Sequence, residues 1–190
     1  AVLSVTTPGV QAEKDTATAT RLAREANDCL AAEVARQPAR YAGFAHLALQ
    51  DPAGAADELE RCVRQLGFKG ALINGQTNGT YLDADSCLPF WERVSALDVP
   101  VYLHPGQMAD APAMFAGRPE LDGAVWAWTA DTASHALRLV FGGTFARFPN
   151  LTIILGHMGE TLPYLLWRLD SRWACTLGRE LAPQEKPSAI

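Results

Sequence analysis

The chain has 190 residues, of which 48% are hydrophobic and 19% charged, a composition that excludes a disordered chain and is sufficient for a buried core. Its net charge is −5 and it contains no run of Lys or Arg, which excludes nucleic acids and membrane surfaces as partners. No stretch reaches the ~20 apolar residues of a membrane span. Four scattered cysteines form no C-x-x-C pair, which favours a reduced, cytoplasmic protein.

Short β-prone runs alternate with longer amphipathic segments along the whole chain, which predicts parallel strands joined by helices in a single domain, residues 1–190. The expected strands are 1–6, 41–47, 69–74, 99–103 and 151–155. The expected helices are 15–35, 53–66, 87–97, 124–141 and 160 to about 174. Pro52 and Gly67 flank the second of these helices, as is usual for helix starts and stops.

Two expected connections, 75–86 and 105–123, are long for a compact α/β unit. Each follows the end of a strand, which is the side of a (β/α) barrel where active sites are built. We therefore expect functional residues at these strand ends.

His104 closes the apolar run Val101-Tyr102-Leu103, and Pro105 stops the strand directly after it. A neutral imidazole fixed at a strand end is a good ligand for zinc or manganese. A hydrogen-bonded core histidine without a ligand role fits the same pattern equally well.

His157 also ends an apolar strand, and Glu160 follows three residues later. With a helix starting near Met158, Glu160 falls in the first turn, where the helix dipole stabilises a carboxylate that reaches back to His157. A histidine oriented by a carboxylate is a proton-transfer pair. The alternative makes Glu160 a helix-start residue and His157 a satisfied turn residue.

Five stretches of the chain resemble the amidohydrolase-related decarboxylases, most of all those that act on 2,6- and 2,3-dihydroxybenzoate. The stretches are AHLALQDP (45–52), LGFKGALINGQ (66–76), VPVYLHP (99–105), ASHALRLVFGGTFARFPNLTIILGHMGE (133–160) and LPYLLWRLD (162–170). The resemblance implies a (β/α)8 TIM barrel with one divalent metal, zinc or manganese, at its mouth. It also implies a small aromatic carboxylate as substrate and a homo-oligomeric assembly.

The same resemblance assigns roles to individual residues. It makes His104 a metal ligand from the fifth strand and His157 with Glu160 a proton-handling pair that does not bind the metal. Trp128 takes the place of an aromatic residue against the substrate ring, and Asn74 lies at the end of the fourth strand inside the pocket. By contrast, we expect structural roles for His135 and Arg168.

The family's first strand carries an acid-x-His or His-x-His metal motif and its closing strand a metal-binding Asp, and neither occurs here. We therefore expect strands two to six of the barrel, with one of the metal ligands, in a piece of a longer gene product. The leading hypothesis is non-oxidative decarboxylation of a hydroxybenzoate by the parent enzyme. The alternatives are a metal-dependent hydrolase, for example of lactones, and an inactive barrel fragment that associates through its open strand edges.

Overall fold

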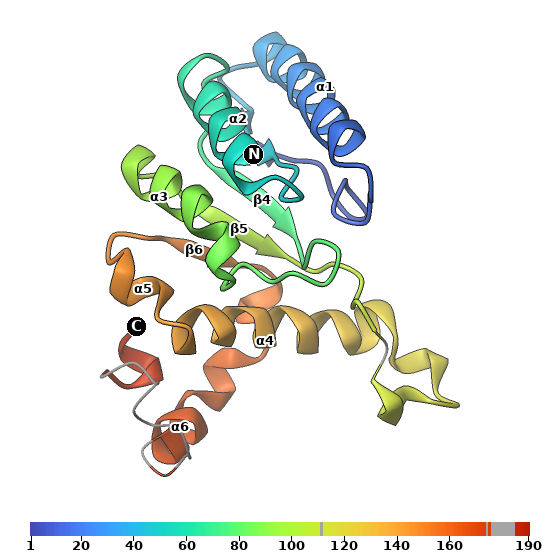
Figure 1. Ribbon diagram of the computed structural model, residues 1–190, viewed down its shortest axis with the longest axis vertical. Coiled ribbons are helices and arrows are strands. Elements are labelled where there is room, and N and C mark those ends of the chain that lie inside the picture. Colours follow the sequence, from blue (N-terminus) through green and yellow to red (C-terminus); the bar gives the residue numbers. More distant parts are fainter. Residues whose placement is uncertain (111, 174, 176–184) are drawn as a thin grey trace.

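The computed structural model describes residues 1–110, 112–173, 175 and 185–190 (Figure 1). Its strands are β1 (Val2–Leu3), β2 (Ala42–Gly43), β3 (Ala45–His46), β4 (Ala71–Asn74), β5 (Val101–His104) and β6 (Ile153–Leu155). Its α-helices are α1 (Thr16–Arg36), α2 (Pro52–Arg64), α3 (Leu88–Leu97), α4 (Ala127–Phe141), α5 (Thr144–Arg147) and α6 (Leu162–Trp173). Strands and helices alternate along the chain as the sequence predicts, with α5 as an unpredicted addition.

The paired strands are parallel: β1 pairs with β2, and β3, β4, β5 and β6 form a four-stranded sheet in chain order. The predicted strand 41–47 is interrupted at Phe44, so that β2 pairs with β1 and β3 pairs with β4. The Phe44 N–H donates to the Leu3 carbonyl, whereas the next N–H, that of Ala45, donates to the Gly70 carbonyl. One segment therefore joins β1 to the rest of the parallel array.

The first two helices begin where the sequence places them. The Asp15 carboxylate accepts the Thr18 N–H at 2.8 Å, and the Asp51 carboxylate accepts the Gly54 N–H at 3.1 Å, so both aspartates cap helix N-termini. Gly67 follows α2 with a φ of +72°, a left-handed conformation that glycine adopts without strain.

Two predicted helix starts are wrong. The helix predicted from residue 124 begins at Ala127, because Gly123–Val125 forms a separate 3-10 turn and Trp126 has φ −150° and ψ −46°. The helix predicted from Glu160 begins at Leu162. Pro163 lacks an N–H and its ring would clash with the carbonyl four residues earlier, so it is tolerated only in a first turn. The predicted end of this helix, near residue 174, lies outside the described residues.

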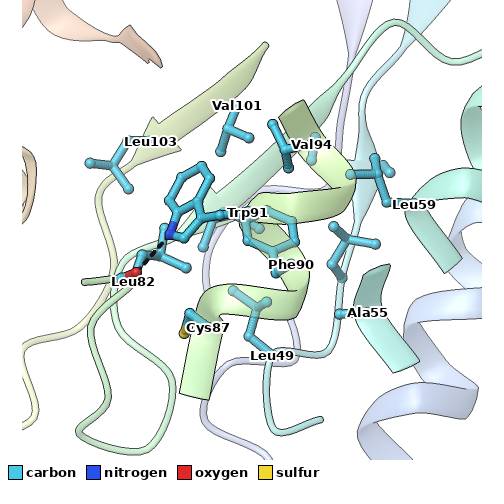
Figure 2. Packing of buried hydrophobic residues seen from close by; sticks show 14 of the residues in the cluster. Leu49, Ala55, Leu59, Leu82, Cys87, Phe90, Trp91, Val94, Val101 and Leu103 are labelled. Carbon is cyan, nitrogen blue, oxygen red and sulfur yellow. Dashed lines mark hydrogen bonds between the residues drawn. The ribbon is translucent and has the colours of Figure 1, made fainter. Parts of the chain in front are cut away.

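The core lies between the parallel strands and the helices that cover them. Leu59 of α2, Trp91 and Val94 of α3, and Val101 and Leu103 of β5 are buried together (Figure 2). The Trp91 indole N–H donates to the Leu82 carbonyl at 2.8 Å, so the one polar atom of this side chain is satisfied.

A buried polar contact fixes α1 against the sheet. The Asn27 side chain accepts the His46 N–H at 2.8 Å and donates to the His46 carbonyl at 2.9 Å. The same amide donates to Glu58 of α2 at 2.9 Å. One residue thus joins a strand and two helices.

Within the described residues, no helix is both long enough and apolar enough to cross a membrane.

Candidate functional site

The strand ends bring the predicted site residues to one edge of the sheet. Asn74 is directly opposite His104 in the β4–β5 ladder, and Leu103 is opposite Leu155 in the β5–β6 ladder. His157 follows β6 by two residues, and its ring centroid lies 5.8 Å from that of His104. The two histidines therefore face one shared region, as the sequence predicts.

His104 is half-buried, and its Nδ1 lies 2.9 Å from the carbonyl oxygen of Pro105. Because a carbonyl oxygen only accepts, Nδ1 carries the proton and Nε2 keeps its lone pair. Burial lowers the pKa of His104, the Pro105 carbonyl raises it in part, and the neighbouring His157 lowers it further. A neutral ring with a free Nε2 fits a metal ligand.

Glu160 is 1% exposed, and its two carboxylate oxygens have different partners. Oε1 lies 2.5 Å from Nδ1 of His157, and Oε2 accepts the hydroxyl of Thr129 in α4 at 2.8 Å. The His157 side chain is 54% exposed. The geometry is that of a proton-carrying imidazole whose inner nitrogen is held by a buried carboxylate.

The helix-dipole explanation for Glu160 is wrong, because Glu160 precedes α6 instead of lying in its first turn. The carboxylate reaches His157 through a tight left-handed turn. His157, Met158, Glu160 and Thr161 have φ values of 46°, 60°, 50° and 68°. Such values cost non-glycine residues free energy and persist only where surrounding contacts hold them, which makes this turn a strained element.

Asn74 ends β4 and is 1% exposed. Its Nδ2 donates to the Val5 carbonyl at 3.2 Å, and its Oδ1 lies 3.3 Å from the Thr7 hydroxyl. Asn74 therefore fastens the loop after β1 to the strand ends, and its contact with a substrate stays a prediction.

Trp128 is the second residue of α4 and is partly buried. Its Nε1 is buried with no hydrogen-bond partner among the described residues, and the next residue is Thr129. A contact of Trp128 with a substrate ring stays a prediction.

Other polar residues that draw attention in the sequence make buried contacts between elements of the fold. The buried ring of His46 accepts the Val10 N–H at 3.1 Å, and that of His135 accepts the Leu82 N–H at 3.0 Å. Burial lowers the pKa of each ring to about 4. The Asp131 carboxylate accepts the Tyr81 hydroxyl at 2.5 Å, which joins α4 to the loop after β4.

Among the described residues, no three His, Cys, Asp or Glu side chains lie close enough together to hold a metal ion. His104 fits one position of such a site, and zinc sites normally need at least three protein ligands. The described part of the chain therefore supplies a fitting ligand but not a complete metal site.

Sequence reasoning missed the hydroxyls of Thr7 and Thr129. Thr7 donates to the Pro105 carbonyl at 2.6 Å, a contact between residues 98 apart in sequence, and Thr129 contacts Glu160 across 31 residues. Neither threonine belongs to a recognisable motif, so no local signal indicates these contacts.

Successive strand–helix units whose carboxyl ends gather histidines and a buried carboxylate define a segment of a (β/α) barrel. The model of the amidohydrolase family matches residues 4–188, and the chain belongs to this family.

Several relatives with a stated activity are close in sequence. The chain is 52% identical over 178 residues to the gamma-resorcylate decarboxylase of Polaromonas sp. JS666, an alignment that covers 90% of the chain and 55% of that protein. It is 48% identical over 181 residues to the gamma-resorcylate decarboxylase of Rhodococcus jostii, with the same coverage. The chain thus spans about half the length of the curated relatives it matches.

Solved structures of decarboxylases are also similar to this chain in fold. A dihydroxybenzoic acid decarboxylase from Polaromonas sp. JS666, with bound manganese and 2-nitroresorcinol, has a TM-score of 0.88 at 49% identity, covering 97% of this chain and 58% of that one. The 5-carboxyvanillate decarboxylase of Sphingomonas paucimobilis has a TM-score of 0.89 at 41% identity, covering 99% and 56%. The predicted partial barrel is therefore confirmed.

Proposed function

We propose that the full-length protein is a metal-dependent decarboxylase that removes carbon dioxide from an ortho-hydroxylated benzoate without oxidation. The observation that carries the proposal is the His157–Glu160 pair beside His104 at one edge of the sheet. The identity of about 50% to gamma-resorcylate decarboxylases supports this choice of substrate class.

One divalent ion, manganese or zinc, belongs to this proposal, and manganese is present in three of the related structures. When bound, such an ion supplies Lewis-acid polarisation of carboxylate and phenolate oxygens. His104 would hold it through Nε2, because the Pro105 carbonyl occupies Nδ1. Among the described residues no three His, Cys, Asp or Glu side chains lie close enough together to complete such a site.

The chain's own residues would position the substrate and handle its protons. Decarboxylation requires a proton to reach the carboxylate-bearing ring carbon as the bond to carbon dioxide breaks. His157, with Nδ1 held by Glu160, can carry a proton at Nε2 and exchange it with the phenolic oxygen of the substrate. Trp128 would pack against the aromatic ring, and Asn74 would line the pocket beside His104.

The test is an assay of the full-length, manganese-loaded protein against a panel of hydroxybenzoates and lactones. We expect carbon dioxide release from 2,6- or 2,3-dihydroxybenzoate, abolished by a chelator and restored by manganese. Lactone hydrolysis without carbon dioxide release would instead make the protein a hydrolase of the same barrel type.

The assembly and the compartment are parts of the same proposal. The outer side of β6 has no partner strand within the described sheet, and an apolar groove of about 360 Å³ lies beside it, lined by residues such as Leu139, Leu155 and Leu166. In a complete barrel the next strand pairs with this edge, so the homo-oligomer is proposed on the family resemblance alone. The free thiols of all four cysteines suit a cytoplasmic location. Light scattering on the full-length protein measures the assembly directly.

A further inference from the structure

The two histidines of the site are built on the same plan. In each ring Nδ1 faces an oxygen acceptor, the Pro105 carbonyl for His104 and the Glu160 carboxylate for His157. Each acceptor in turn accepts a threonine hydroxyl, from Thr7 and Thr129 respectively. We propose that these hydroxyls are positioning groups, one for each histidine, so that Thr7 tunes metal binding and Thr129 tunes proton transfer. This inference rests on the proposed function, which makes His104 a metal ligand and His157 a proton carrier.

On the His104 side, the Pro105 carbonyl accepts two hydrogen bonds, 2.6 Å from the Thr7 hydroxyl and 2.9 Å from Nδ1 of His104. The Thr7 hydroxyl has one proton, and Pro105 is much closer than the Oδ1 atom of Asn74, which lies 3.3 Å away. The proton therefore goes to Pro105. This bond restricts rotation of the peptide that fixes the imidazole, and it connects the loop after β1 to the end of β5.

On the His157 side, the Thr129 hydroxyl is the partner of the buried Oε2 atom of Glu160. Without it, Oε2 would be a buried, unpaired carboxylate oxygen, and the carboxylate would be free to rotate away from Nδ1 of His157. The turn that carries both residues is strained in its backbone, so few local forces would resist that movement. Thr129 lies on the regular helix α4, outside the turn, and its hydrogen bond keeps the Glu160 carboxylate in place.

Groups that orient a metal ligand or a catalytic base act through it, and their loss typically costs 10–100-fold in metal affinity or in activity. The two threonines serve different histidines, so their removal should affect different quantities. A threonine that only adds to packing would affect neither.

The experiment uses the full-length protein with Thr7→Val and Thr129→Val, which remove the hydroxyl at constant shape, and Thr7→Ser and Thr129→Ser, which retain it. Thr132→Val is the matched control, because Thr132 is buried on the same helix as Thr129 and its hydroxyl has no hydrogen-bond partner among the residues that the structure describes. Three quantities are measured: the Kd for Mn²⁺, kcat at saturating Mn²⁺, and the ¹⁵N shifts of both histidine rings in the metal-free protein.

We expect Thr7→Val to weaken Mn²⁺ binding by about 10–100-fold and to mix the tautomers of His104. Thr129→Val should lower kcat by about 10–100-fold, leave the Kd for Mn²⁺ within about twofold, and mix the tautomers of His157. Both serine variants should restore the native values, and Thr132→Val should match the native protein throughout.

Valine variants with native Kd, kcat and ¹⁵N shifts would overturn the inference, as would equal losses in the Thr132→Val control. The Mn²⁺ affinity and the ¹⁵N shifts need no substrate. A protein that decarboxylates no hydroxybenzoate therefore disproves the proposed function while these two measurements still decide the roles of the threonines.

Discussion

His104 and His157 end neighbouring strands with similar apolar sequences, yet their surroundings differ. His104 extends directly from β5, whose Val101 and Leu103 are fully buried, and the loop after β1 covers its neighbour Pro105. His157 lies in a left-handed turn after β6. The three residues of β6 are only partly buried. The same pattern of an apolar run followed by histidine thus produces a rigid position on one strand and a strained, more exposed one on the next.

The largest expected effect concerns the rigid position. Replacing His104 by Ala in the full-length protein removes a metal ligand, so metal content and activity should be lost together. Metal analysis of the purified variant beside the activity assay checks this. A variant that retains a full equivalent of metal would contradict the ligand role.

The strained position should behave differently. His157→Ala should leave the metal content nearly native while lowering kcat by roughly 10²–10⁴-fold, the usual contribution of a positioned acid or base. The same two measurements distinguish the histidines. Parallel loss of metal would show that His157 is a ligand and would remove the functional difference between the two strand ends.

The packing of β5 makes the next prediction. Leu103→Ala deletes a fully buried side chain and should lower the free energy of unfolding by about 2–5 kcal/mol. Denaturant unfolding of the full-length variant measures this cost. A cost below about 1 kcal/mol would contradict the close packing of the strand that carries His104.

A smaller effect is a pH dependence of stability that originates at His46. Burial lowers the pKa of His46 from 6.5 to about 4, so the folded protein keeps the ring neutral while the unfolded chain protonates near pH 6.5. The unfolded state binds more protons between these values, so stability falls as pH drops from about 6.5 to 4, by up to about 3 kcal/mol for this group.

His46→Gln removes this titration and retains an acceptor for the Val10 N–H. The slope of unfolding free energy against pH, measured by denaturant unfolding, should therefore decrease between pH 6.5 and 4. His135 keeps its own contribution in both proteins, since its pKa is lowered to about 4 by the same cause. An unchanged slope would show that folding does not lower the pKa of His46.

The elements of the fold follow from the sequence to a large extent, and the site follows in part. Apolar runs predict the strands and helices, and Asp15, Asp51 and Gly67 mark helix ends. These signals are readable from the sequence because helix capping and hydrophobic periodicity involve residues only a few positions apart. The break at Phe44 is set by two different neighbouring strands, which no local pattern encodes.

Within the site, the pairing of His157 with Glu160 is recoverable because the residues are three apart, although the dipole argument for it fails. The metal-ligand role of His104 and the roles of Asn74 and Trp128 stay predictions. The supporting hydroxyls of Thr7 and Thr129 are absent from the sequence interpretation because folding alone brings them to their acceptors.

Pro163 has a consequence for how such sites are recognised in other sequences. By fixing the start of α6, it leaves Glu160 outside the helix and able to turn back toward His157. A chain with the letters GHMGE but without a proline three positions later could extend the helix backward and direct the carboxylate elsewhere. The informative signature is therefore GHMGE-x-x-P, in which the proline specifies the geometry and the histidine and glutamate specify the chemistry.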